Sequence, residues 1–258
     1  QHFNTTVPLL LFGKYVWEND ETFTAKVQIS HHAEKDLKGE VTWNVTDEKG
    51  NKIADGNFNP VDFKNGFITD LGVLKIDLST ILEAKKLIIS VTLLNTSFKN
   101  EWAIWVYPKK LPAIHNSEII FADRLDNETL TKLKSGAKIL LNANELGTNE
   151  TSVVASFYPL YWSLTFFPGQ GKTNIGLLLD NKHPAFHHFP TSFHSNWQWE
   201  TISADAKGFL LNDLSHNYLP IAQPIDDFHR NNEVGSIFEL KVDEGKLLVC
   251  GYNLNAEK

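Results

Sequence analysis

The first 108 residues consist largely of strand-sized runs in which apolar and polar side chains alternate. Phe23, Ala25, Val27 and Ile29 occupy every second position between polar neighbours, which is the period of a half-buried β-strand. Turn residues such as Asn65-Gly66 separate further runs of strand type at 41–45, 52–56, 67–76, 86–95 and 100–107. This pattern predicts an antiparallel β-sandwich, which we place at residues 1–110.

The pattern changes after the linker-like stretch 109–112. A segment with helical leucine spacing, 126–134, lies between short apolar runs at 119–122 and 137–141. Strands that alternate with helices typically form a mostly parallel sheet covered by helices. We therefore predict a second domain, residues 111–258, with an α/β fold of the flavodoxin-like type. Later strand candidates are 175–179, 208–211, 236–242 and 246–250, the last two joined as a hairpin.

Composition excludes several classes of protein. The net charge is −7 without a long Lys/Arg block, which argues against nucleic acid as a partner and against a broad membrane-surface patch. No run approaches the roughly 18–20 apolar residues of a membrane helix. The only cysteine, Cys250, cannot form a disulfide within the chain. Methionine is absent even from position 1, so we expect a processed terminus or, preferably, a fragment of a longer protein.

No motif for nucleophilic catalysis or cofactor binding is evident. The chain has no Gly-x-Ser-x-Gly and no Gly-x-Gly-x-x-Gly, and residues 168–173 lack the first glycine and the spacing of a Walker sequence. Cys250 ends an apolar run, where a buried and unreactive thiol is expected. We therefore predict no cofactor and no catalytic residue in this chain.

Histidines are concentrated between residues 183 and 229. Imidazole is a common zinc ligand, but the spacing of His183, His187, His188, His194 and His229 matches no metal motif. We therefore predict no metal site.

The same region combines aromatic and polar side chains in a way that suits sugars. Sugar rings stack on tryptophan, and charged side chains hydrogen-bond the hydroxyl groups. One alternative is that the two tryptophans pack against the sheet; another is that Asp227 and Arg230 form an ion pair that orders a loop. Asp226 and Asp227 are sequence neighbours whose side chains diverge in extended backbone, so they do not form a glycosidase pair. The predicted carbohydrate-binding residues are Trp197, Trp199, Asp226, Asp227, His229 and Arg230.

Segments from both halves resemble a known family. Residues 12–23 and 37–50 resemble the immunoglobulin-like segments of large glycoside hydrolase family 2 proteins from Bacteroides-type gut bacteria, and 182–199, 224–230 and 245–250 resemble their C-terminal portion. The resemblance implies an immunoglobulin-like domain followed by a domain similar to class I glutamine amidotransferases. No cysteine follows a nucleophile-type turn and no His-x-Glu lies near the end, so the catalytic residues of that second family are not carried over.

The resemblance implies a non-catalytic accessory region of a polysaccharide-degrading enzyme, which contacts carbohydrate beside a catalytic barrel absent from this chain. It also implies a location in the periplasm or on the surface of a Gram-negative bacterium. One alternative is a structural module that docks on the barrel or on a second copy as a homo-oligomer. Another is a self-contained hydrolase in which His194 or His229 acts as base with Asp226 or Asp227.

Overall fold

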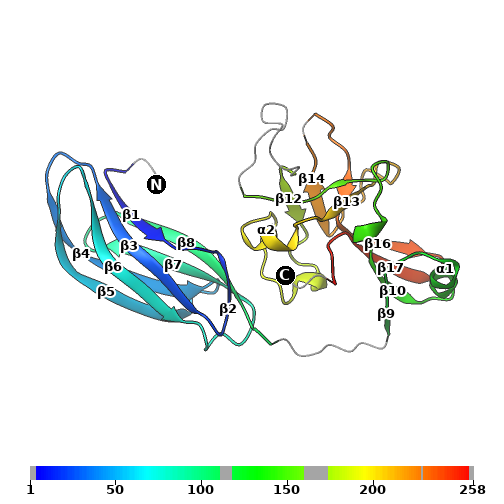
Figure 1. Cartoon of the computed structure of the whole chain (residues 1–258), viewed down its shortest axis with the longest axis horizontal. Coiled ribbons are helices and arrows are strands. Elements are labelled where there is room, and N and C mark those ends of the chain that lie inside the picture. Colours follow the sequence, from blue (N-terminus) through cyan, green and yellow to red (C-terminus); the bar gives the residue numbers. More distant parts are fainter. Residues whose placement is uncertain (1–3, 111–117, 160–173, 228, 256–258) are drawn as a thin grey trace. The chain divides into compact units, whose positions relative to one another are not determined.

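The computed structural model of the 258-residue chain describes residues 4–110, 118–159, 174–227 and 229–255 (Figure 1). The chain forms two compact units. Unit 1 comprises residues 1–112 and 188–190, and unit 2 comprises 113–187 and 191–258.

Unit 1 is built from eight strands in two sheets. One sheet has the order β1-β3-β6 and the other β2-β8-β7-β4-β5; neighbouring strands are antiparallel except for the short pair β2 and β8. The strands are β1 (Thr6–Leu11), β2 (Val16–Glu18), β3 (Thr22–His31), β4 (Leu37–Asp47), β5 (Lys52–Phe63), β6 (Phe67–Asp77), β7 (Lys85–Leu93) and β8 (Lys99–Tyr107).

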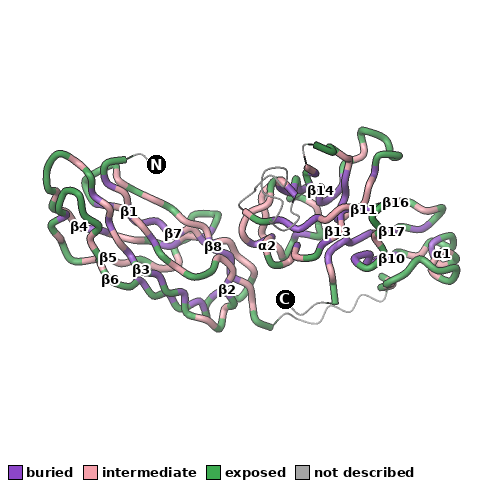
Figure 2. Tube along the Cα trace, turned by 45° about the horizontal axis from the view of Figure 1, so that its top comes forward, coloured by how far each residue is buried: buried purple, intermediate pink, exposed green. Residues whose placement is uncertain are grey.

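The core of unit 1 follows the alternation seen in the sequence. Phe23, Ala25, Val27 and Ile29 of β3 are each at most 1% exposed, while the residues between them face outward (Figure 2). Burying one large apolar side chain contributes about 1.5–3 kcal/mol, so a continuous row of them stabilises the sandwich. The predicted β-sandwich is confirmed.

Unit 2 contains a six-stranded sheet, β12-β14-β16-β17-β10-β9, and a three-stranded sheet, β11-β13-β15. Its strands are β9 (Ile119–Ala122), β10 (Lys138–Asn142), β11 (Ser152–Val154), β12 (Gly176–Leu179), β13 (Lys207–Leu210), β14 (Ala222–Ile225), β15 (Val234–Gly235), β16 (Ile237–Val242) and β17 (Gly245–Cys250). Its helices are α1 (Asn127–Lys134) and α2 (Gln198–Ile202), with single 3₁₀ turns at Asn144–Leu146 and Pro184–Phe186.

Only part of the large sheet has the predicted α/β character. Strand β10 is parallel to both β9 and β17, and α1 connects β9 to β10. The helix begins at Asp126, whose carboxylate accepts from the Thr129 N–H at 2.8 Å, and buries Leu133 completely.

The remainder of the large sheet is antiparallel. Strands β12, β14 and β16 join it through antiparallel pairs, and β16 returns as β17 through a tight turn at 243–244. Antiparallel strands can be joined by short turns and do not need the crossover helices that connect parallel strands, so the sheet is covered by few helices. The prediction of a mostly parallel, helix-covered sheet is wrong, and neither a flavodoxin-like nor a glutamine-amidotransferase-like fold is supported.

The junction between the two parts of the large sheet is narrow. Strand β14 pairs with β16 only at Ala222 and Ile237, whereas β16 and β17 pair at six positions. None of the helices in the described residues is long and apolar enough to cross a membrane.

Candidate functional site

Trp199 lies in the interior of unit 2. Its side chain is 1% exposed, its indole N–H donates to Thr191 Oγ1 at 2.9 Å, and its ring contacts Phe186 and Tyr252 with centroids 5.6 and 5.8 Å away. A ring enclosed in this way cannot stack on a sugar. Trp199 is a packing residue, which is the alternative that the sequence left open.

Trp197 is half-buried where α2 begins, and its backbone N–H donates to Asn196 Oδ1 at 2.8 Å. The segment before it runs beside β12, because Leu179 N–H donates to Phe193 O and Ser195 N–H donates to Leu177 O. This pairing fixes the backbone of Phe193 and His194 at the edge of the sheet.

Asp226 forms the centre of the loop that follows β14. Its carboxylate accepts from Arg230 Nη2 at 2.7 Å and from Asn232 Nδ2 at 2.8 Å, and its side chain is only 2% exposed. Burial raises the pKa of this carboxyl group, but hydrogen bonds led by that from Arg230 outweigh the effect, so the pKa lies below its ordinary value. The loop therefore uses the Asp226 carboxylate for its own structure.

Asp227 also serves the local backbone. Its carboxylate accepts from the His229 backbone N–H at 2.7 Å, and its carbonyl accepts from the N–H groups of Arg230 and Asn231. The ion pair of this loop is thus formed by Asp226, not by Asp227, with Arg230. His229 and Arg230 are exposed at the tip.

Strand β12 separates the two predicted segments. Ser195 lies along one edge of β12, whereas Ile175, just before β12, donates to Ile225 O on the other side. Trp199 is buried and the Asp226 side chain is only 2% exposed, so the six predicted residues do not form one exposed surface.

A groove of about 720 Å³ lies beside the narrow junction between β14 and β16. We call it the Phe193 groove. Its apolar wall includes Leu178, Phe193 and Leu219, which are 42%, 66% and 80% exposed, and its polar wall includes Asp180, His183 and Glu239. Concave sites with an apolar lining and a few polar groups are typical ligand sites.

The carboxylates of the groove form few contacts within the described residues. Asp180 Oδ1 accepts one hydrogen bond, from the Lys182 N–H at 3.3 Å, and Glu239 Oε1 lies 3.9 Å from Nε2 of the His183 imidazole. Tyr218 fixes this rim, because its hydroxyl donates to the Glu239 carbonyl at 2.5 Å; burial raises the pKa of Tyr218.

His183 has a defined orientation. The Ala185 N–H donates to His183 Nδ1 at 3.2 Å and thereby caps the 3₁₀ turn that follows. Since Nδ1 accepts, the proton of the neutral ring lies on Nε2, which points toward Glu239. The groove therefore offers one imidazole donor and two carboxylate acceptors.

This groove has almost no local signature in the sequence. Phe193 stands alone among polar residues, Leu219 follows no helical or strand period, and Glu239 reaches the groove from a distant strand. The only signal was a lone phenylalanine beside His194, whose ring contacts it edge-on at 4.8 Å.

Other candidate sites carry less chemistry. Cys250 is buried, and burial raises the pKa of its thiol to about 11, so the neutral thiol is the form present near pH 7. In the described ranges, no three His, Cys, Asp or Glu side chains gather where they could hold a metal ion. The Walker-like stretch 168–173 lies outside the described residues.

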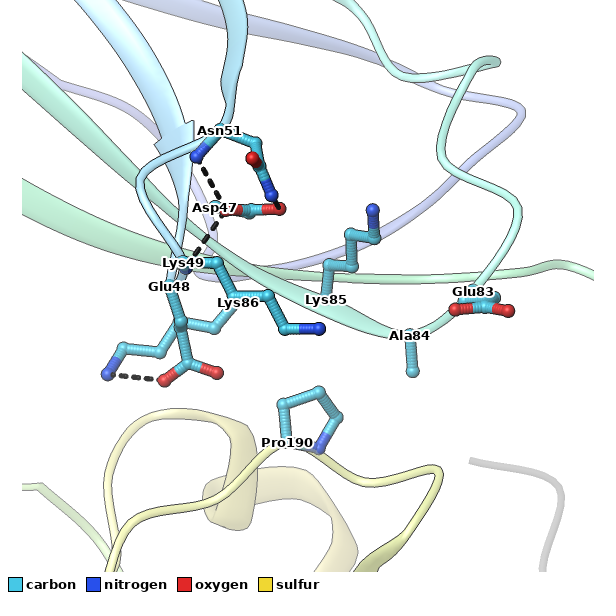
Figure 3. A pocket seen from close by; sticks show the side chains of 9 residues that line it. All are labelled: Asp47, Glu48, Lys49, Asn51, Glu83, Ala84, Lys85, Lys86 and Pro190. Atoms are coloured by element: carbon cyan, nitrogen blue, oxygen red, sulfur yellow. Dashed lines mark hydrogen bonds and ion pairs between the residues drawn. The ribbon is translucent and has the colours of Figure 1, made fainter.

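The β4–β5 turn of unit 1 shows how a polar cluster can be fully structural. Asp47 accepts from the backbone N–H groups of Lys49 and Asn51 and from Asn51 Nδ2, each at 2.9 Å (Figure 3). The Asn51 side chain and these N–H groups hold the pKa of Asp47 below its ordinary value. Beside this turn, Glu48 pairs with Lys86 at 3.4 Å.

Three solved structures share distant similarity with parts of the chain. They are the alkylpurine DNA glycosylase AlkC of Pseudomonas fluorescens bound to DNA containing an abasic site analog (10% identity, TM-score 0.32, 40% of this chain and 30% of that chain), a cycloisomaltooligosaccharide glucanotransferase of Paenibacillus sp. complexed with cycloisomaltoheptaose (10%, 0.33, 51% and 19%) and a β-glucuronidase from glycoside hydrolase family 2 (12%, 0.27, 38% and 11%). The chain thus spans less than a third of each of these proteins. No functional inference rests on likenesses this distant.

No curated protein matches the chain. Two family models do. Residues 21–108, most of unit 1, match the family described as Domain of unknown function (DUF8488). Residues 120–258, just over half of the chain, match Domain of unknown function (DUF8487), and the chain therefore belongs to that family.

Proposed function

We propose that this chain is a non-catalytic accessory region of a protein related to glycoside hydrolase family 2, and that unit 2 binds a saccharide in the Phe193 groove. The family 2 part of the proposal rests on the sequence resemblance of residues 12–23 and 182–199. The observation that carries the binding site is an exposed aromatic ring that lines the same groove as two carboxylates with few contacts of their own.

The apolar wall suits the hydrophobic face of a sugar ring. The Phe193 side chain is 66% exposed, and its backbone is hydrogen-bonded to β12. The ring is therefore accessible to solvent while the backbone that carries it is fixed. Aromatic side chains lose little conformational entropy on binding because they have only two side-chain torsions. Leu178 and Leu219 add to the apolar lining.

The polar wall suits the hydroxyl groups. Ionised carboxylates accept hydrogen bonds about twice as strong as those of neutral acceptors, and each has room for several donors. Within the described residues, Asp180 uses one such position and the Glu239 carboxylate accepts no hydrogen bond, with His183 Nε2 3.9 Å away, so sugar hydroxyls can replace water on both. His183 adds a donor for a ring or hydroxyl oxygen.

Calorimetry of the whole 258-residue chain against oligosaccharides selected on a glycan array tests the proposal. Truncating a buried aromatic anchor typically costs about 1–3 kcal/mol, so Phe193→Ala should weaken binding by roughly tenfold or more. The matched control is Phe67→Ala in unit 1, where the side chain is 65% exposed, against 66% for Phe193. Equal loss in both variants would refute the site.

A docking role is the second candidate, and it is favoured by the exposed apolar side chains of Leu178, Phe193 and Leu219, which line one groove, because apolar patches of this kind occur at protein interfaces. A folded chain that binds no saccharide on the array, while a longer version of the protein protects Phe193 from hydroxyl-radical labelling, would establish docking in place of sugar binding.

A further inference from the structure

Three lysines lie side by side on one face of the large sheet of unit 2. Lys138 of β10 pairs in register with Lys246 of β17, and Lys246 pairs in register with Lys241 of β16. All three are exposed. Strand spacing places the outer two about 10 Å apart, so they form a continuous lysine row.

The lysine row lies on the face opposite α1. The residues next to the lysines along the strands, Ile139, Leu247 and Leu240, belong to or pack against the core that includes Leu133 of α1. Successive side chains of a strand point to opposite faces. The lysine side chains therefore point away from α1, and they are exposed on the opposite face of the sheet.

The positive charge of the row is only partly balanced. Lys138 pairs with Glu118 at 2.8 Å, but no carboxylate of the described residues lies within 4 Å of the ammonium group of Lys241 or Lys246. Glu239 lies on the same face, two residues before Lys241, but within the described residues neither it nor Asp243 nor Glu244 forms an ion pair with Lys241 or Lys246. Like charges directly opposite each other in a sheet are destabilising, so the row is costly as long as it holds no anion.

An apolar row runs parallel to the lysines, two residues further along the strands. Phe121, Leu140 and Leu248 pair in register across β9, β10 and β17, and Phe121 is 51% exposed. The two rows are about 7 Å apart. That distance matches a sugar ring that packs on the apolar row while a charged substituent reaches the lysines.

We propose that this face binds an anionic polysaccharide, with sulfate or carboxylate groups on the lysine row and a ring against Phe121. The site adjoins the Phe193 groove, because Glu239 of that groove lies beside Leu248 on the same face, but neither Lys241 nor Lys246 lines the groove. Nucleic acid is disfavoured because the chain carries a net charge of −7 and the row spans only two strand spacings, too short for a track of phosphates.

Binding of a dextran sulfate oligosaccharide to the whole chain, with unsulfated dextran of the same length beside it, tests the proposal. We expect binding of the sulfated form only, and at least a tenfold weaker affinity in the double variant Lys241→Thr/Lys246→Thr. The matched control is Lys38→Thr/Lys75→Thr, which removes two exposed lysines from strands of unit 1. Equal losses in both double variants would overturn the site.

Two further measurements separate a binding role from a structural one. Without an anion, Lys241→Thr/Lys246→Thr should unfold at a temperature about 1–2 °C above that of the unchanged chain, because it relieves repulsion; a lower temperature would contradict the proposal. Phe121→Ala should weaken dextran sulfate binding several-fold with an unchanged salt dependence. A thymidine oligonucleotide of equal charge that binds as tightly as dextran sulfate would overturn the assignment to a polysaccharide.

Discussion

Two regions of unit 2 carry carboxylates in similar numbers but differ in what those carboxylates contact. In the loop after β14, Asp226 accepts from Arg230 and Asn232 within 2.8 Å and is nearly inaccessible. In the Phe193 groove, Asp180 accepts one long hydrogen bond, and the Glu239 carboxylate accepts none from the described residues, with His183 Nε2 3.9 Å away. In the first region the polar groups stabilise the loop itself, whereas in the second they remain available to water or a ligand.

The same contrast separates the aromatic residues. Trp199 satisfies its indole N–H on Thr191 and is enclosed by other rings, whereas Phe193, six residues earlier, is 66% exposed. The residue type alone therefore does not identify a candidate binding residue. The better criterion is whether its ring or polar atoms remain exposed and without partners in the folded protein.

The largest expected effect is on the stability of the interior. Trp199→Ala should reduce the free energy of unfolding of unit 2 by about 3–5 kcal/mol, because it removes a fully buried aromatic side chain and its hydrogen bond. Phe193→Ala should change it by less than about 0.5 kcal/mol. Urea denaturation of the two variants gives both free energies. If Phe193→Ala lowers the free energy of unfolding as much as Trp199→Ala does, Phe193 is a packing residue too.

An intermediate effect concerns pH. The pKa of Asp226 is lower in the folded chain than in the unfolded chain, so its contribution to stability is present above the unfolded value of about 3.9 and is lost as pH falls through the folded value. Asp226→Asn should reduce stability at pH 7 by about 1–2 kcal/mol, since Arg230 and Asn232 lose a charged acceptor. It should also flatten the decline of stability below pH 4.

Thermal unfolding from pH 7 to pH 3 measures this decline in the unchanged chain and in Asp226→Asn. A variant that loses stability with acid as steeply as the unchanged chain would show that the loop carboxylate is not the group responsible.

The smallest effect is expected for the groove. Glu239→Gln should alter stability at pH 7 by less than about 0.5 kcal/mol, because the Glu239 side chain is 59% exposed and forms no hydrogen bond within the described residues. The same variant should weaken saccharide binding, since an amide replaces a charged acceptor. A loss of stability as large as that of Asp226→Asn would show that the Glu239 carboxylate stabilises the fold, as the Asp226 carboxylate does.

Sequence patterns predicted the parts of the fold that rest on local periodicity. The alternation in β3 and the leucine spacing in α1 each reflect one buried face, and both elements form as expected. Strand β14 was expected only as a strand end before Asp226, without bounds, because Ala222-Gln-Pro-Ile is short and contains a proline, which cannot donate to a sheet. Strand direction was misjudged because a short strand carries no signal of the partner beside which it lies.

The candidate site was harder to predict for a related reason. A Trp-x-Trp pattern is equally compatible with burial and with exposure, and only the rings of Phe186 and Tyr252, distant in sequence, decide that Trp199 is buried. The Phe193 groove depends on where β16 meets β14, which is a tertiary contact without a local signature.

The single residue pair between β14 and β16 has a consequence for hydrogen exchange. Only one residue pair joins β12 and β14 to β16, although β14 also contacts β15, so we expect the amide hydrogens of Leu177 to Leu179 to exchange earlier than those of Leu247 to Val249. The Phe193 groove draws residues from both sides of this junction, with Leu178 and Gln223 on one side and Glu239 on the other. A ligand bound there would hold the two parts of the sheet together, and the slowed exchange of β12 would report its presence.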